Sequence, residues 1–258
     1  MQAEEPGRPR RAIYLLPNLL TTTALFGGFY GIVAAIGGNF ERAALSLFVA
    51  AVFDGLDGRV ARWTKTESAF GKEYDSLSDM VSFGVAPALI SYQWGIAGIA
   101  DYGTAWARFG WLAAFFYAVA AALRLARFNT RTGSVDKRYF EGLPSPAAAA
   151  LVASFIWTAD TFDLGHQAGL AGLALGFGVT ALAGALMVSQ FAYPSFKNVG
   201  ATKRVRFASL LLVPLTFMAI AANPPAMLLA FSGTFALSAP LLWAFRRLRR
   251  RPREAGEG

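Results

Sequence analysis

Eight long apolar runs, separated by short polar segments, constrain the fold of this 258-residue chain more than any other feature. A helix needs about 20 apolar residues to cross the ~30 Å hydrocarbon core of a bilayer, where it satisfies its own backbone hydrogen bonds. The chain is 55% hydrophobic and 16% charged, whereas a soluble domain of this size carries more charge. We therefore expect an all-α, polytopic membrane bundle of about eight transmembrane helices, forming one catalytic domain over residues 1–258. The runs are residues 13–36, 43–62, 80–100, 107–126, 145–160, 168–192, 207–222 and 225–245.

The basic residues separate onto one side of this predicted bundle. All 24 Lys and Arg except Arg42 and Arg108 fall in the terminal segments or in connections on the same side as the termini. Because cytoplasmic loops carry the excess of Lys and Arg, we expect the protein in the cell (inner) membrane with both termini and the site cytoplasmic. Residues 1–12 and 246–258 would be basic cytoplasmic segments. Such segments beside a span contact anionic membrane lipid, so the net charge of +8 does not predict nucleic-acid binding.

Four aspartates interrupt the apolar pattern at helical spacing. On a helix, positions 54, 57, 58 and 61 share one face, and positions 71, 75 and 79 share another. Each face combines acids with residues that have almost no side chain, which leaves room for a ligand. Two such faces opposed would bring together the carboxylates of Asp54, Asp57, Asp75 and Asp79.

A divalent cation is the natural partner of such a cluster, because gathered carboxylates in an apolar setting otherwise take up protons. The chain has no cysteine, and its one histidine, His166, lies far away in sequence and is interpreted as a bystander. Oxygen-only ligands select a hard metal such as Mg2+ or Mn2+ over zinc. Salt bridges from the acids to Arg59, Arg62 or Lys65 are the alternative, but they do not explain the interleaved small residues.

The spacing Asp-x2-Asp-Gly-x2-Ala-Arg-x8-Gly-x3-Asp-x3-Asp over residues 54–79 resembles the signature of the CDP-alcohol phosphotransferase family at every fixed position. The resemblance implies a membrane enzyme that transfers a phosphatidyl-type group from a CDP-linked lipid to an alcohol and releases CMP. It further implies two divalent cations, Mg2+ or Mn2+, held by the four aspartates, and a homodimer. By the same analogy, Asp79 is the aspartate least committed to metal and is our candidate for the general base.

The resemblance also assigns a nucleotide and phosphate site. Asn18 belongs to a Pro-Asn-Leu-Leu-Thr segment that resembles the opening of the family's first span, although hydrogen bonding between helices is an equally good reading of the bare sequence. Three small residues would let cytidine approach the backbone, and one arginine would pair with a phosphate. The expected residues are Asn18, Gly58, Ala61, Arg62 and Gly71.

Three further segments resemble the branch of the family that transfers the group from CDP-diacylglycerol to L-serine. They begin at Ser78, Leu125 and Phe140. Arginines at one helical face, together with a neighbouring amide, are candidates for binding serine or a lipid phosphate, and anchoring of the span is the alternative. These candidates are Arg124, Arg127, Asn129 and Arg131, with Arg127 first because it lies inside the Leu-Ala-Arg-Phe-Asn segment.

Two other functions fit parts of the pattern. Another acceptor, such as glycerol 3-phosphate or an inositol phosphate, would use the same aspartates. A cation transporter also places acids within the membrane, but its acids should line a path through the bilayer. The four aspartates instead cluster at one face, which favours the enzyme.

Overall fold

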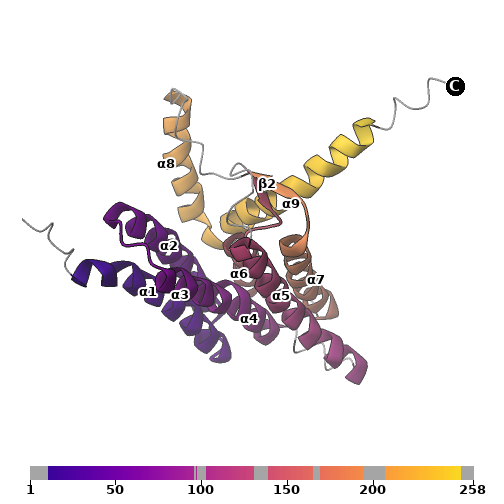
Figure 1. The fold of residues 1–258 in the computed structure, drawn as a ribbon. Helices are drawn as coiled ribbons and strands as arrows, with labels where there is room; N and C mark the ends of the chain where they lie inside the picture. The colour runs from indigo at the N-terminus through magenta and orange to yellow at the C-terminus, as the bar shows by residue number, and fades with distance from the viewer. Residues whose placement is uncertain are drawn as a thin grey trace, which may run out of the picture.

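A computed structural model of the chain describes residues 11–95, 97, 103–130, 139–164, 169–194 and 207–250. The described part is helical apart from one short two-stranded ladder (Figure 1). The elements are α1 (Arg11–Ile36), α2 (Phe40–Thr64), α3 (Ala69–Asp79), the π-helical segment η1 (Met80–Val85), α4 (Ala86–Trp94), α5 (Thr104–Thr130), β1 (Tyr139–Glu141), α6 (Ser145–Thr161), α7 (Gly169–Val188), β2 (Ala192–Pro194), α8 (Phe207–Ala222) and α9 (Pro224–Arg250).

Each predicted apolar run corresponds to a helix, which confirms the all-α class. The third run differs most, because its helix begins upstream at Ala69 and continues through η1 to Trp94. The basic tail also differs in part, since α9 includes residues 246–250. Among the described residues, four helices are long and apolar enough to cross a membrane, so the chain is an integral membrane protein. These spans are Leu15–Ile36, Phe109–Thr130, Gly169–Val188 and Pro224–Arg247.

Two tight reversals place α1, α2 and α3 side by side (Figure 1). After α1, the side chain of Asn39 accepts a hydrogen bond from the Arg42 N–H and so caps the start of α2. After α2, Lys65 adopts a left-handed conformation with φ 54°, which ends the helix. Ser68 then caps α3 by accepting from the Gly71 N–H at 3.0 Å. The second reversal therefore turns the chain back within four residues, and α3 packs against α1.

The π-helical segment η1 follows directly on the last aspartate and packs closely against α1. A Cβ added to Gly28 of α1 would lie 2.6 Å from the Cα of Ser82, so only glycine allows this approach. The Ser82 hydroxyl donates to the Ala24 carbonyl at 3.1 Å. From the other side, the buried Tyr117 hydroxyl of α5 donates to the Phe83 carbonyl at 3.1 Å. These contacts fix the helix that carries Asp79 between α1 and α5.

The second half of the chain is organised around α6, which is buried against α2, α7 and α9. The antiparallel ladder pairs Tyr139 with Pro194 and Glu141 with Ala192. Gly142 follows β1 with φ 75°, and its N–H donates to the Phe191 carbonyl at 2.9 Å. The next N–H, of Leu143, donates to the Leu186 carbonyl at 2.9 Å. The segment that leads into α6 is thereby tied to the end of α7.

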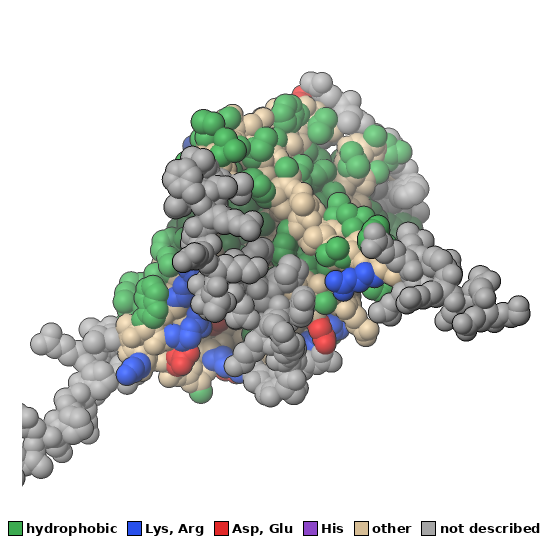
Figure 2. Space-filling view, turned by 90° about the horizontal axis from the view of Figure 1, so that it is seen from above, with side chains coloured by type: hydrophobic (Ala, Val, Ile, Leu, Met, Phe, Trp, Pro, Cys, Tyr) green, Lys and Arg blue, Asp and Glu red, His purple; other side chains and the backbone are tan. Residues whose placement is uncertain are grey.

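Charged and apolar side chains occupy different parts of the surface. In the view of Figure 2, most of the visible Lys and Arg side chains lie toward the lower edge, and hydrophobic side chains cover much of the rest. Large apolar side chains are exposed on several helices, for example Phe29 on α1, Phe115 on α5 and Leu241 on α9. Helix α8 stands apart from the bundle and packs beside α9 (Figure 1). Large apolar side chains exposed on the helices are expected of a protein whose apolar faces contact lipid.

Candidate functional site: an aspartate cluster beside a cavity

The four aspartates converge between α2 and α3, as the two helical faces predict. One carboxylate oxygen from each of Asp54, Asp57 and Asp75 lies within 4.8 Å of the other two. The carboxyl group of Asp75 lies close to that of Asp57, and the carboxyl group of Asp79 lies close to that of Asp54. Asp57 and Asp75 form the outer pair. Asp54 and Asp79 form a second pair, one helical turn further along each helix.

The electrostatics of the cluster fit a divalent cation. Burial, followed by the charges of Asp57 and Asp54, raises the pKa of Asp75 to about 7. Burial and the charge of Asp54 likewise raise the pKa of Asp79. One Oδ1 atom of each of Asp75 and Asp79 is buried without a hydrogen-bond partner. Buried carboxylates with unused oxygens and only oxygen neighbours are the donor set that Mg2+ and Mn2+ prefer.

Helix α1 contributes a polar contact to this cluster. The Thr21 hydroxyl donates to Asp57 Oδ2 at 2.7 Å, and the Ser78 hydroxyl of α3 donates to the Thr21 carbonyl at 3.2 Å. Both hydroxyl groups are buried. Thr21 therefore orients an aspartate and connects α1 to both helices that carry the acids.

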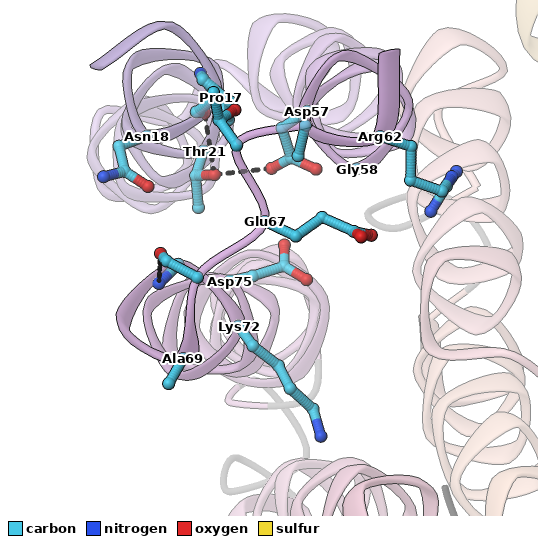
Figure 3. Close-up of a pocket in the computed structure, with 14 residues that line it drawn as sticks. Pro17, Asn18, Thr21, Asp57, Gly58, Arg62, Glu67, Ala69, Lys72 and Asp75 are labelled. Carbon is cyan, nitrogen blue, oxygen red and sulfur yellow. Dashed lines mark hydrogen bonds between the residues drawn. The ribbon is translucent and has the colours of Figure 1, made fainter. Parts of the chain in front are cut away.

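A cavity of about 510 Å³ opens beside the outer pair of aspartates. Figure 3 shows Asp57 of α2 and Asp75 of α3 pointing toward one another, with Thr21 of α1 beside them. All five residues expected to bind nucleotide and phosphate line this cavity: Asn18, Gly58, Ala61, Arg62 and Gly71. A Cβ added to Gly58 would meet nothing closer than the Arg62 side chain at 3.6 Å, so space remains above the backbone there.

The candidates for acceptor binding are placed differently from one another. Arg124 donates from Nη1 to the Ser145 hydroxyl at 3.0 Å and carries a charge that acts on Asp79. Arg127 donates from Nη2 to the Val188 carbonyl at 3.4 Å. Asn129 donates from Nδ2 to the Ser76 hydroxyl at 2.9 Å. Arg131 and His166 lie outside the described residues.

Sequence reasoning missed several residues of this region. The stretch that turns the chain from α2 into α3 supplies part of the cavity wall, where the Glu67 carboxylate extends between the two helices (Figure 3). Thr21 was expected only to face protein or ligand, because it lies three residues after Asn18 on the same helical face. Ser145 had no local signal, since its partner Arg124 is 21 residues away. The missed residues are Thr66, Glu67, Ser68, Lys72 and Ser145.

Comparison with known proteins identifies the family of this chain. The sequence model of the CDP-alcohol phosphatidyltransferase family matches residues 14–191, which is more than half of the chain and includes all four aspartates. This chain belongs to the CDP-alcohol phosphatidyltransferase family. The resemblance carried by the aspartate motif is confirmed.

Similar family members include bacterial, archaeal and eukaryotic proteins. A CDP-diacylglycerol–serine O-phosphatidyltransferase of Helicobacter pylori is 37% identical over 237 residues, covering 92% of this chain and 94% of the relative. An archaetidylserine synthase of Methanothermobacter thermautotrophicus is 34% identical over 189 residues, covering 72% of each chain. A CDP-diacylglycerol–serine O-phosphatidyltransferase of Saccharomyces cerevisiae is 38% identical over 151 residues, covering 53% of this chain and 51% of the relative.

Proposed function

We propose that this protein transfers the phosphatidyl group of CDP-diacylglycerol to the hydroxyl group of L-serine, forming phosphatidylserine and CMP. One observation carries the proposal. A carboxylate cluster borders a cavity of about 510 Å³ in a membrane protein that is 37% identical, over nearly its whole length, to a CDP-diacylglycerol–serine O-phosphatidyltransferase. The three relatives described above differ in organism, and their names all specify a serine product or substrate.

The cavity is proposed as the site for the cytidine nucleotide. Asn18 offers an amide, and Arg62 offers a guanidinium to a phosphate oxygen. Gly58, Ala61 and Gly71 present little side chain, so a planar base can lie close to the backbone of α2 and α3. The diacyl chains of the donor would extend into the surrounding lipid.

Asp54, Asp57, Asp75 and Asp79 are proposed to hold two divalent cations, Mg2+ or Mn2+. When bound, these cations would neutralise the diphosphate of the donor and the phosphate of the departing CMP. Thr21 holds Asp57 in orientation for this role through its 2.7 Å hydrogen bond. The Ser78 hydrogen bond to the Thr21 carbonyl holds α3 in place beside it.

The proposed transfer makes one bond and breaks one bond at the same phosphorus atom. The serine hydroxyl oxygen forms a bond to the phosphorus of the phosphatidyl group, while the bond from that phosphorus to the CMP oxygen breaks. Asp79 is our candidate for the group that accepts the hydroxyl proton. The products are phosphatidylserine and CMP, which retains the bridging oxygen.

Measurement of CMP release tests this function. Purified protein with CDP-diacylglycerol and Mg2+ or Mn2+ should release CMP when L-serine is added. Glycerol 3-phosphate and inositol phosphate, given separately at the same concentration, should produce little CMP. Faster release with either of these alcohols would overturn serine as the acceptor, and no release with any alcohol would overturn the enzyme assignment.

We also propose that all eight helical runs span the inner membrane, with both termini and the aspartate cluster facing the cytoplasm. The one-sided distribution of Lys and Arg supports this orientation. A homodimer is proposed on family resemblance alone. Chemical cross-linking of the protein in native membranes tests that assembly, and a monomer band without a dimer band would contradict it.

A further inference from the structure

The aspartate cluster has a second side, formed by α5. This helix packs against η1, and a hydrogen bond joins its end to α3. Asn129 donates to Ser76, and Tyr117 donates to the Phe83 carbonyl. Arg124 lies between these two contacts, where its charge acts on Asp79. The guanidinium of Arg124 is thus within electrostatic range of Asp79.

Two buried polar atoms on this side have no hydrogen-bond partner. They are Nε of Arg124 and Oδ1 of Asp79. Leaving a buried donor and a buried acceptor unpaired is costly, and each such pair in a folded protein calls for an explanation. A ligand that offers an acceptor to the guanidinium and a hydroxyl to the carboxylate would satisfy both atoms. Serine carries both groups.

The geometry of phosphoryl transfer places the acceptor on this same side. In an in-line displacement, the attacking and leaving oxygens lie on opposite sides of the phosphorus. The proposed nucleotide cavity borders the outer pair, Asp57 and Asp75. The attacking hydroxyl must therefore approach from the side of the inner pair, Asp54 and Asp79, which is where Arg124 lies.

We propose that Arg124, held in place by Ser145, binds the carboxylate of the amino-acid acceptor and aims the acceptor hydroxyl at Asp79. The inference rests on the proposed function and names the residue that selects serine. Ser145 is fully buried at the first turn of α6, and it fixes the guanidinium by accepting from Nη1 at 3.0 Å. Nε is left to face the ligand. Ser145 is therefore a positioning residue.

The contacts of Arg127 separate it from this role. Its Nη2 donates to the Val188 carbonyl at the end of α7, where a cation also complements the helix dipole. Arg127 thus fastens α7 to α5. Of the two arginines, Arg124 has the unpaired buried nitrogen and the electrostatic link to Asp79.

Arg124→Lys tests the proposal, because lysine keeps the charge and loses the planar fork. The KM for serine should rise by about 10- to 100-fold, the loss typical of a charge-assisted hydrogen bond, while the KM for CDP-diacylglycerol changes by less than about twofold. Calorimetric titration of purified protein with L-serine in the presence of CMP should show the same weakening and needs no turnover. An unchanged serine affinity in both measurements would overturn the role of Arg124.

Ser145→Ala keeps the proposal testable if the Arg124 variant does not fold. It should raise the serine KM in the same direction by a smaller factor, and Ser145→Thr should restore it, because threonine retains the hydroxyl. Arg247→Lys on α9, where Arg247 lies over the Trp243 ring, is the matched control and should behave as wild type. A raised serine KM in Arg127→Lys with none in Arg124→Lys would assign the carboxylate to Arg127 instead. Wild-type protein that releases no CMP with serine would refute the proposed function itself, whatever the variants do.

Discussion

Asp75 shows how a destabilising arrangement can be a functional one. Its carboxyl group is buried beside two other acids, and its pKa of about 7 reflects the cost of charging it there. In the protein without metal, removing one acid should relieve the repulsion between the carboxylates. In the protein with metal, the same change should weaken the binding of the cation. The same substitution therefore has opposite effects on the two forms.

Asp75→Asn should abolish serine-dependent CMP release while leaving a folded protein. Mg2+ or Mn2+ at the proposed site should stabilise wild type by about 2.7 kcal/mol at a hundredfold excess over its Kd, so the thermal unfolding temperature should rise on adding the metal. In the variant this rise should be largely lost, and the metal-free unfolding temperature should be no lower than that of wild type. Thermal unfolding in detergent, with and without metal, measures both effects.

Glu41→Gln is the matched control, since Glu41 is an exposed acid in the first turn of the same helix α2. It should keep both activity and the metal-induced rise. Near-normal CMP release by Asp75→Asn would contradict the four-aspartate site.

Asp79→Asn should differ from both of these variants. Its kcat should fall by about 10²- to 10⁴-fold, and its metal-induced rise in unfolding temperature should be reduced less than in Asp54→Asn.

The residues that could be predicted from the sequence are those whose neighbours are local. The aspartates and the small residues of the cavity follow helical spacing over 26 positions, and every cavity residue expected from the motif lies in the cavity. The different surroundings of Arg124 and Arg127 could not be predicted, because the two lie three residues apart on one helical face. Their partners, Ser145 and Val188, are 21 and 61 residues away, so only the folded chain distinguishes them.

The π-helical segment η1 is the element that depends most on its surroundings. No local feature of residues 80–85 predicts a π-turn. Its Phe83 carbonyl accepts a hydrogen bond from Tyr117 of α5, and its Ser82 lies against Gly28 of α1. The segment therefore exists because two other helices accommodate it. Since η1 begins directly after Asp79, its packing also sets the position of the inner aspartate pair.

Gly28→Ala should weaken this packing. The added methyl group would lie 2.6 Å from the Ser82 backbone, which must move to admit it, and overpacking of this kind typically costs about 1–3 kcal/mol. The unfolding temperature should fall, and CMP release should fall with it. Gly178→Ala on α7 is the comparison, because a methyl group there would meet nothing within 4 Å and alanine favours the helix. Equal unfolding temperatures for the two variants would show that α1 and η1 are not closely packed.

The eight apolar runs predicted the number and order of the principal helices, because length and hydropathy dominate in a bilayer. The ends of the predicted helices were less accurate. α3 is a polar helix that leads into an apolar one, and the last turns of α9 are a polar extension of an apolar helix. Hydropathy alone detects neither. In the part of the chain that the structure describes, four helices meet the length and hydropathy of a span by themselves. The others are shorter, contain the acids of the site or include the π-helical segment.

Single cysteines can test the proposed orientation directly, because the chain has no cysteine of its own. Gly37→Cys in the turn after α1 and Leu164→Cys in the turn after α6 should react with a membrane-impermeant maleimide from the outside of intact cells. Glu73→Cys, on the exposed face of α3, should react only in inverted vesicles. Labelling of positions 37 and 73 from the same side would refute the orientation. Serine-dependent CMP release by each variant controls for folding.

The hydrogen bond from Arg124 to Ser145 forms later in synthesis of the protein than the contacts around the aspartates. The contacts around the aspartates, from Thr21 to Asp57 and from Ser78 to Thr21, are complete once the first 80 residues have emerged from the ribosome. Arg124 has no serine to hold it until α6 has followed it into the bilayer, and synthesis proceeds from the N-terminus. A nascent chain that ends after α5 would thus already contain the proposed cation ligands, whereas the guanidinium of Arg124 would still lack the hydrogen bond that fixes its position.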